Sequence, residues 1–226
     1  MSKGIFITGT GTDIGKTYVT ALIVKKLRDS GLNACYFKAA VSGNEKIDNV
    51  LIPGDAKYIS TVANIKEDLF KMVPYVYENA VSPHLASKIE GNPVDMDVVK
   101  RYYKNICERY DYVIMEGSGG IVCPIRFDEK KIWLVDIIKE LNLDTIVVAD
   151  AGLGTINNVV LTIEYMKQRN INVRGIILNH YEGNLMEEDN KKMIEYCTNI
   201  PVIACIGKDD KEINISADII WNTKWR

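Results

Sequence analysis

The stretch that most restricts the possible folds is a glycine-rich turn at residues 9–17, with the sequence GTGTDIGKT. It joins an apolar, β-branched run at residues 5–8 to a segment whose apolar residues recur four apart, which predicts a strand, a turn and a helix. A phosphate-binding loop occupies this position and ends in the same GKT, although it usually has four residues between its two glycines. Here five residues separate Gly9 from Gly15. We therefore predict a phosphate loop that is one residue longer than usual.

The chemistry of this turn depends on its backbone and on two side chains. Free N–H groups and the positive end of the following helix attract anionic oxygens. Lys16 would reach the β- and γ-phosphates, and the Thr17 hydroxyl would face Mg²⁺. The alternative is a plain glycine- and threonine-rich turn in which Lys16 only begins a solvated helix face. The glycines, the GKT and the position between strand and helix together favour phosphate binding.

The rest of the chain alternates short apolar runs with longer amphipathic segments, a pattern typical of an α/β fold with a mostly parallel sheet flanked by helices. Strands are expected at residues 5–8, 34–37, 112–115, 145–149, 173–178 and 202–205. Helices are expected at residues 16–28, 98–108, 134–140, 157–167 and 186–197. With no repeat or linker, residues 1–226 are expected to form one domain. The tail, residues 208–226, could form a last strand, a packed coil or a loop over a ligand.

Charge and cysteine content narrow the function. Lys and Arg number 28 against 30 Asp and Glu, a net charge of −2, so neither nucleic acid nor a membrane surface is an expected partner. The five cysteines are scattered and form no C-x-x-C pair, which favours buried free thiols in a reducing compartment. No secretory leader or membrane-spanning run is visible in the sequence. We expect a cytoplasmic protein that acts on small molecules.

Polar residues follow two further predicted strands. Lys38 and Ser42 come after the second strand, and Glu116 ends the third and precedes GSGG. Open α/β sheets bind ligands at the carboxyl ends of their strands, where a carboxylate suits Mg²⁺. Asp55 is a candidate helix N-cap, and a second Mg²⁺ ligand if the fold brings it to the phosphates.

Taken in order, these motifs resemble the dethiobiotin synthetase family, and the resemblance covers most of the chain. The family's phosphate loop is lengthened in the same way, as G-T-x-T-[DE]-x-G-K-T. The further matches are K-x-x-x-[ST]-G at residues 38–43, G-D-A around Asp55, S-P-H at residues 82–84, E-G-x-G-G at residues 116–120 and LNHY at residues 178–181. The sequence departs from the family where Ala39 replaces a common proline and Asp13 a common glutamate, and the segment after Cys205 shows no matching nucleotide-base loop.

The resemblance implies a three-layer, P-loop NTPase-like fold and a homodimeric ligase of biotin biosynthesis. The family converts 7,8-diaminononanoate, CO₂ and MgATP to dethiobiotin, ADP and phosphate. One amine captures CO₂ as a carbamate, the carbamate attacks the γ-phosphate to give a mixed anhydride, and the second amine closes the ring.

The resemblance also assigns residues to roles. The catalytic set is Lys16, Lys38, Thr12, Asp13 and Ser42. The nucleotide set is Gly11, Thr12, Asp13, Ile14, Gly15, Lys16, Thr17, Tyr18, Glu116 and Asn179, the last as a base contact. The diamine set is Ser42, Gly119, Leu153, Gly154, Thr155 and Asn157, and the turn at residues 153–157 would come from the neighbouring subunit. Mg²⁺ would take Thr17, Asp55 and Glu116.

Other interpretations remain open at this point. Thr155 or Asn157 could simply cap a helix, His84 could start a helix or line a substrate pocket, and His180 could belong to a nucleotide loop or to packing. The main functional alternative is a switch ATPase of the partitioning or septum-placement type, but that class carries a lysine where Gly11 stands. A ligase related to cobyric acid synthases, or a purely structural nucleotide-binding module, is a weaker alternative.

Overall fold

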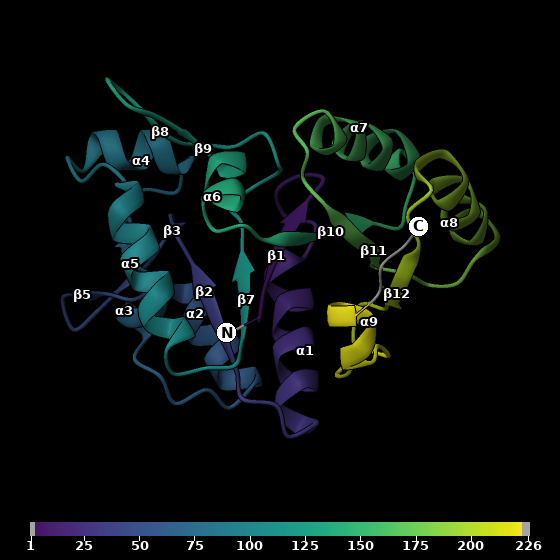
Figure 1. Ribbon diagram of the computed structural model, residues 1–226, viewed down its shortest axis with the longest axis horizontal. Coiled ribbons are helices and arrows are strands. Elements are labelled where there is room, and N and C mark those ends of the chain that lie inside the picture. The colour runs from purple at the N-terminus through teal and green to yellow at the C-terminus, as the bar shows by residue number, and fades with distance from the viewer. Residues whose placement is uncertain (1–2, 223–226) are drawn as a thin grey trace.

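The computed structural model describes residues 3–222 and is built on a six-stranded, all-parallel sheet (Figure 1). The strand order is β12-β11-β10-β1-β7-β2. The bounds are β1 Lys3–Gly9, β2 Ala34–Lys38, β7 Tyr112–Glu116, β10 Asp144–Asp150, β11 Val173–Asn179 and β12 Val202–Ile206. All six predicted strands are confirmed. Their central residues are apolar and, except in the partly buried edge strand β12, fully buried, as a parallel sheet covered on both faces requires.

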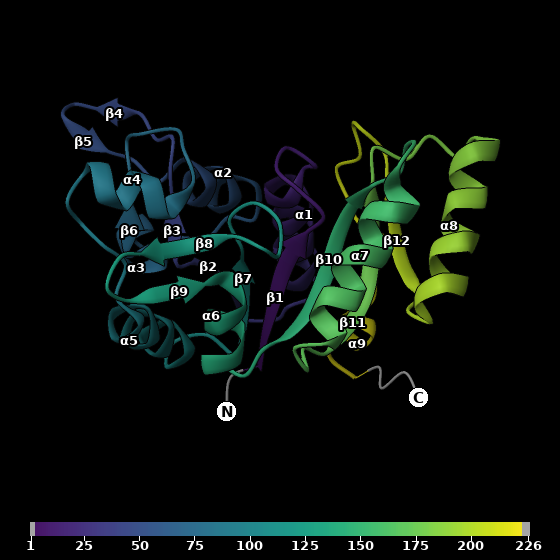
Figure 2. The same cartoon turned by 90° about the horizontal axis from the view of Figure 1, so that it is seen from above.

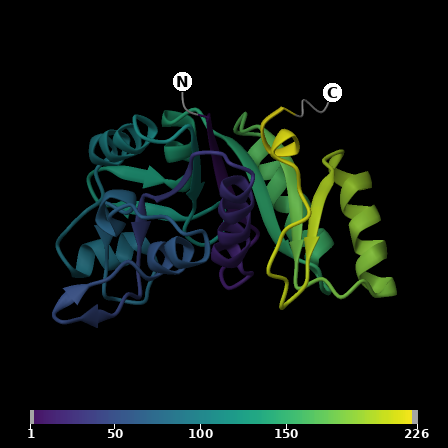
Figure 3. The same cartoon turned by 90° about the horizontal axis from the view of Figure 1, so that it is seen from below.

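Helices cover the two faces of this sheet and complete three layers (Figures 2 and 3). One face carries α1, Lys16–Asp29, with α2, Gly54–Val62, and α9, Ala217–Asn222. The other carries α6, Leu134–Glu140, and α7, Thr155–Lys167, and α8, Leu185–Thr198, packs against α7. The remaining predicted helix, expected at residues 98–108, is α5, Met96–Cys107, which packs on β2 and β7. The predicted three-layer α/β fold is therefore confirmed.

Several smaller elements have no counterpart among the predicted ones. They are β3 Ala40–Val41, β4 Lys46–Ile47, β5 Val50–Leu51, α3 Leu69–Met72, β6 Tyr75–Val76, α4 Pro83–Ile89, β8 Pro124–Phe127 and β9 Lys131–Trp133. In the tail, Ile213 and Ile215 are buried in a coil that leads into α9, so the tail forms a packed coil ending in a helix rather than a strand. Residues 223–226 of the tail lie outside the described residues.

The cysteines and the helices bear on two further expectations. All five cysteines are free thiols, but Cys197 is exposed and only Cys35 and Cys123 are fully buried, so the expectation of uniformly buried thiols is wrong. Between residues 3 and 222, no helix combines the length and the apolar character needed to cross a bilayer.

The register of the sheet decides which side chains meet. Lys38 and Glu116 are direct partners on β2 and β7, and Ile7 of β1 is the partner of Glu116 on the other side. The carboxyl ends of these three strands therefore lie together at one edge, beside the turn that leads from β1 into α1.

Candidate active site

The turn between β1 and α1 has the geometry of an anion-binding loop. Gly15, the N-cap of α1, has a φ of 82° and offers no side-chain cap, so the first N–H groups of the helix remain free for a ligand. A Cβ on Gly15 would lie 2.1 Å from Asn179 Nδ2, so only glycine fits there. Lys16 is 7% exposed and donates through Nζ to the Gly11 carbonyl at 2.6 Å. The ammonium thus lies over the loop.

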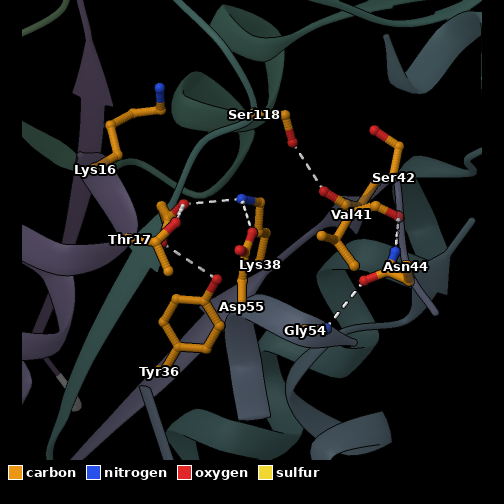
Figure 4. A network of polar contacts seen from close by, with 12 residues as sticks. Lys16, Thr17, Tyr36, Lys38, Val41, Ser42, Asn44, Gly54, Asp55 and Ser118 are labelled. Carbon is orange, nitrogen blue, oxygen red and sulfur yellow. Dashed lines mark hydrogen bonds and ion pairs between the residues drawn. The ribbon is translucent and has the colours of Figure 1, made fainter. Parts of the chain in front are cut away.

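A cluster of charged side chains lies beside this loop (Figure 4). Lys38 Nζ is 2.8 Å from Glu116 Oε1 and 2.6 Å from Asp55 Oδ2. Thr17 Oγ1 donates to the same Glu116 oxygen at 2.9 Å. Four side chains from β2, β7, α1 and α2 therefore converge on one point.

Burial and charge act in opposite directions on the two lysines. Burial lowers the pKa of Lys38, but the carboxylates of Glu116 and Asp55 outweigh it, so the pKa ends above its ordinary value. Burial also lowers the pKa of Lys16, and the more distant Glu116 does not compensate for it. Lys38 is held as a cation, while Lys16 lacks a full counter-charge.

Ten residues line a cavity of about 400 Å³ at this point. They are Thr12, Asp13, Gly15, Lys16, Thr17, Lys38, Ser42, Asp55, Glu116 and Gly119. A neighbouring cavity of about 710 Å³ shares Thr12, Asp13, Ser42 and Gly119, and extends over Val81, Pro83 and Val122. The structure thus brings together all of the catalytic and metal-binding residues that the sequence singled out, next to a second and more apolar space.

Other predicted site residues lie elsewhere. The turn with Leu153, Gly154, Thr155 and Asn157 lines neither cavity, and Leu153 is 92% exposed. Gly154 is the N-cap of α7, and no side-chain hydrogen bond caps this helix, so the expectation that Thr155 or Asn157 caps it is wrong.

Two nucleotide candidates, Asn179 and Tyr18, have structural contacts instead. Asn179 lies buried beneath the loop and donates through Nδ2 to the Ile14 carbonyl at 2.9 Å. Tyr18 donates through its hydroxyl to the Asp210 carbonyl in the tail. The role of Asn179 as a base contact stays a prediction.

Two further expectations concern caps. Asp55 is not an N-cap, because Pro53 holds that position and Asp55 lies in the first turn of α2. His84 lies in the first turn of α4, where its Nδ1 is 3.0 Å from the Ser82 hydroxyl, so its role as a helix-start residue is confirmed.

The structure adds supporting residues that the sequence did not single out. Tyr36 donates to the second oxygen of Glu116 at 3.4 Å. It lies two residues before Lys38 on β2, and this spacing, which puts both side chains on one face of the strand, could have predicted its place in the site. Asn44 is buried and accepts from the Gly54 N–H at 2.9 Å, which fixes the start of α2 and so the position of Asp55. No local pattern marks Asn44, because its partners Val41, Gly54 and Tyr77 are brought together only by the fold.

The donor set suits Mg²⁺ better than a softer metal. Among residues 3–222 there is no cluster of three His, Cys, Asp or Glu side chains that could hold a metal by themselves. Two carboxylates, Asp55 and Glu116, meet at Lys38 Nζ, and the Thr17 hydroxyl donates to Glu116. Mg²⁺ commonly takes one or two carboxylates and completes its shell with water and phosphate oxygens, so these residues fit it.

Sequence comparison finds proteins similar along nearly the whole chain. The family model described as an AAA domain matches residues 3–215. The ATP-dependent dethiobiotin synthetase BioD of Brachyspira hyodysenteriae (strain ATCC 49526 / WA1) is 54% identical over 208 residues, which are 91% of this chain and 92% of that protein. The protein of the same name from Clostridium botulinum (strain Loch Maree / Type A3) is 50% identical over 219 residues, 96% of each chain.

Comparison of structures finds more distant proteins with the same architecture. The MinC:MinD cell division protein complex of Aquifex aeolicus contains a chain with a TM-score of 0.57 and 14% identity, covering 93% of this chain and 83% of that one. A ParA family ATPase from Chlorobium tepidum TLS gives a TM-score of 0.55 at 14% identity, covering 92% and 85%. At such low identity these likenesses establish a shared fold and nothing about activity.

Proposed function

The chain belongs to the family of ATP-dependent dethiobiotin synthetases, ligases of biotin biosynthesis, and on this premise we propose how its residues carry the reaction. The observation that supports the proposal is the convergence of Lys16, Lys38, Thr17, Asp55 and Glu116 on one cavity beside a second, more apolar one. The first would hold the phosphates of ATP, and the second the diamine. The switch-ATPase alternative is set aside, because the likeness to MinD and ParA proteins extends only to the fold, whereas the relatives at 50% identity and above are named dethiobiotin synthetases.

Two substrate anions must come together in this reaction. An amine of 7,8-diaminononanoate attacks CO₂ and loses a proton to give a carbamate, and a carbamate oxygen then attacks the γ-phosphorus while ADP leaves. The carbamate and the triphosphate repel each other. Lys38, held as a cation at the end of β2, would lie between them and offset the repulsion. Lys16 would hold the β- and γ-phosphate oxygens in line with the attacking oxygen.

Ring closure needs positioning more than acid or base catalysis. The second amine attacks the carbonyl carbon of the mixed anhydride, phosphate leaves, and the lost proton passes to phosphate or water. Thr12, Asp13 and Ser42 line both cavities and would orient the amines and the carbamate. Mg²⁺, held by Thr17, Asp55 and Glu116, would neutralise phosphate charge when bound.

Lys38 contacts both carboxylates of this Mg²⁺ set. It would therefore hold the two carboxylates in place before MgATP binds. With Asp55 and Glu116 serving as metal ligands, the Lys38 ammonium would be available to the substrate anions.

We also propose that the protein works as a cytoplasmic homodimer. The turn at residues 153–157 lines neither cavity and exposes Leu153, which suits a role at the site of a neighbouring subunit. Its helix N-terminus would bind the substrate carboxylate. Five free cysteines suit a reducing compartment.

The direct test measures dethiobiotin and ADP formed by the purified protein with MgATP and bicarbonate, with and without 7,8-diaminononanoate. We expect ADP release to depend on the diamine, and both products to be lost in Lys16→Ala and Lys38→Ala. Lys100→Ala is the control, because Lys100 forms an exposed ion pair with Glu140. Diamine-independent ATP hydrolysis without dethiobiotin would contradict the proposal.

Mixing two inactive variants tests the dimer. Lys38→Ala and Thr155→Val subunits would each be impaired alone. If the turn serves the partner's site, each mixed dimer contains one intact site, and random mixing restores about a quarter of the activity. No recovery after verified subunit exchange would show that the turn acts within its own subunit.

A further inference from the structure

A chain of hydrogen bonds runs from the end of β10 to the phosphate loop. Asp150 Oδ2 is 2.7 Å from His180 Nδ1, and His180 Nε2 is 3.2 Å from Asn179 Nδ2. Asn179 Nδ2 in turn donates to the Ile14 carbonyl at 2.9 Å. Asp150 and Asn179 are register partners on β10 and β11, so the sheet itself brings the members of this chain together.

The direction of each bond follows from the chemistry of its members. An amide nitrogen can only donate, so His180 Nε2 must accept from Asn179 and carry no proton. The proton is then on Nδ1 and is donated to Asp150. The bond to His180 lowers the pKa of Asp150, although burial acts in the other direction, so the carboxylate stays ionised. A reversed Asn179 amide would put its oxygen against the Ile14 carbonyl, so both acceptors hold the amide in one orientation.

The backbone at His180 also points to a functional reason for this arrangement. His180 has a φ of 56°, in the left-handed region that a non-glycine residue enters at some cost. That conformation lets the ring turn back onto Asp150 and Asn179. The other Asp150 oxygen accepts the Gly152 N–H at 2.7 Å, so the carboxylate is itself fixed from a second side.

Fixing the Ile14 carbonyl fixes a group that faces the ligand. In a planar trans peptide the carbonyl and the next N–H point in opposite directions. Since the Ile14 carbonyl points to Asn179, the Gly15 N–H points away from Asn179. This N–H is one of the free donors at the start of α1.

We propose that His180 is a positioning residue for the phosphate loop, with Asp150 holding its ring and Asn179 passing its constraint to the Ile14–Gly15 peptide. The inference rests on the proposed function only in that the loop binds a nucleotide. It assigns a role to Asp150 and His180, two residues outside both cavities.

Two variants test the arrangement. His180→Asn removes the ring but keeps a residue type that tolerates the left-handed backbone. Asp150→Asn keeps an oxygen for the Gly152 N–H but removes the charge that holds the imidazole. Tyr181→Phe is the control, because within residues 3–222 the Tyr181 hydroxyl bonds to Glu188 alone, outside this chain of contacts.

The measurement is MgADP affinity by calorimetry, with the KM values for ATP and for the diamine. We expect His180→Asn to weaken MgADP binding and raise the KM for ATP by about three- to tenfold, the effect of one lost hydrogen bond, with the KM for the diamine unchanged. Asp150→Asn should shift both values in the same direction and add nothing in the His180→Asn background.

Unchanged MgADP affinity in His180→Asn, or fully additive effects of the two variants, would overturn the inference. If His180→Asn does not fold, Asp150→Asn alone decides, and wild-type affinity in it counts against the inference. A protein that makes no dethiobiotin, yet binds MgADP in a manner that depends on His180, would contradict the proposed function and leave the inference standing.

Discussion

Replacing Lys38 by methionine tests the charge cluster at the centre of the site. Lys38 is 5% exposed and Glu116 is 1% exposed, so the substitution would leave the Glu116 carboxylate buried without its cation. Removing one partner of a buried pair typically costs about 3–5 kcal/mol of unfolding free energy. Thr17 and Tyr36 still donate to Glu116, so we expect the lower end, about 3 kcal/mol.

The assay is urea unfolding of the ligand-free protein at neutral pH, with two companion variants. Lys100→Met breaks an ion pair of the same 2.8 Å length whose side chains are 46% and 49% exposed, and it should cost at most about 0.5 kcal/mol. The double variant Lys38→Met/Glu116→Gln removes the stranded charge and should recover most of the lost stability. Equal losses for Lys38→Met and Lys100→Met, or no recovery in the double variant, would refute the reasoning.

Two further predictions concern the phosphate loop. Burial holds the pKa of Lys16 below its ordinary value of 10.5, and phosphate oxygens would raise it. In the alkaline range below pH 10.5, nucleotide binding should therefore take up protons and weaken as the pH rises. Calorimetry in two buffers of different ionisation enthalpy measures this uptake, and its absence throughout that range counts against the prediction. Gly15→Ala should lower nucleotide affinity by more than about tenfold, because the new Cβ would overlap Asn179. Gly31→Ala is the control: Gly31 has a φ of 80° but open space around it, so this variant should only lower the free energy of unfolding, by about 1–2 kcal/mol. Equal nucleotide affinities of the two variants would show that the loop tolerates a displaced Asn179 side chain.

The sequence predicts the sheet well because its signals are local. Each of the six strands is an apolar run that must be covered on both faces, and each is found where expected. The same logic places Lys38 and Glu116 together, since both end parallel strands. Helix α3 was missed because four residues are too few to show a helical period.

Contacts that depend on distant segments escaped prediction. Asn44 accepts a hydrogen bond from the Gly54 N–H, and Asp150 accepts one from His180, thirty residues away along the chain. No spacing rule connects such pairs; only the register of β10 and β11, and the return of the chain before α2, bring them into contact. The turn at residues 153–157 differs from these pairs, because its proposed partner is the site of a neighbouring subunit and a single chain does not contain it.

The strand order has a consequence for how this protein is made. The phosphate loop lies within the first 17 residues, but β1, which carries it, pairs with β7 and β10, which end at Glu116 and Asp150. At about 5–20 residues per second, a ribosome needs roughly 7–30 s between completing the loop and completing the strand that flanks it. The binding loop therefore lacks its full set of sheet neighbours until about two thirds of the chain has been made. A nascent-chain experiment should find nucleotide binding only after β10 has left the exit tunnel.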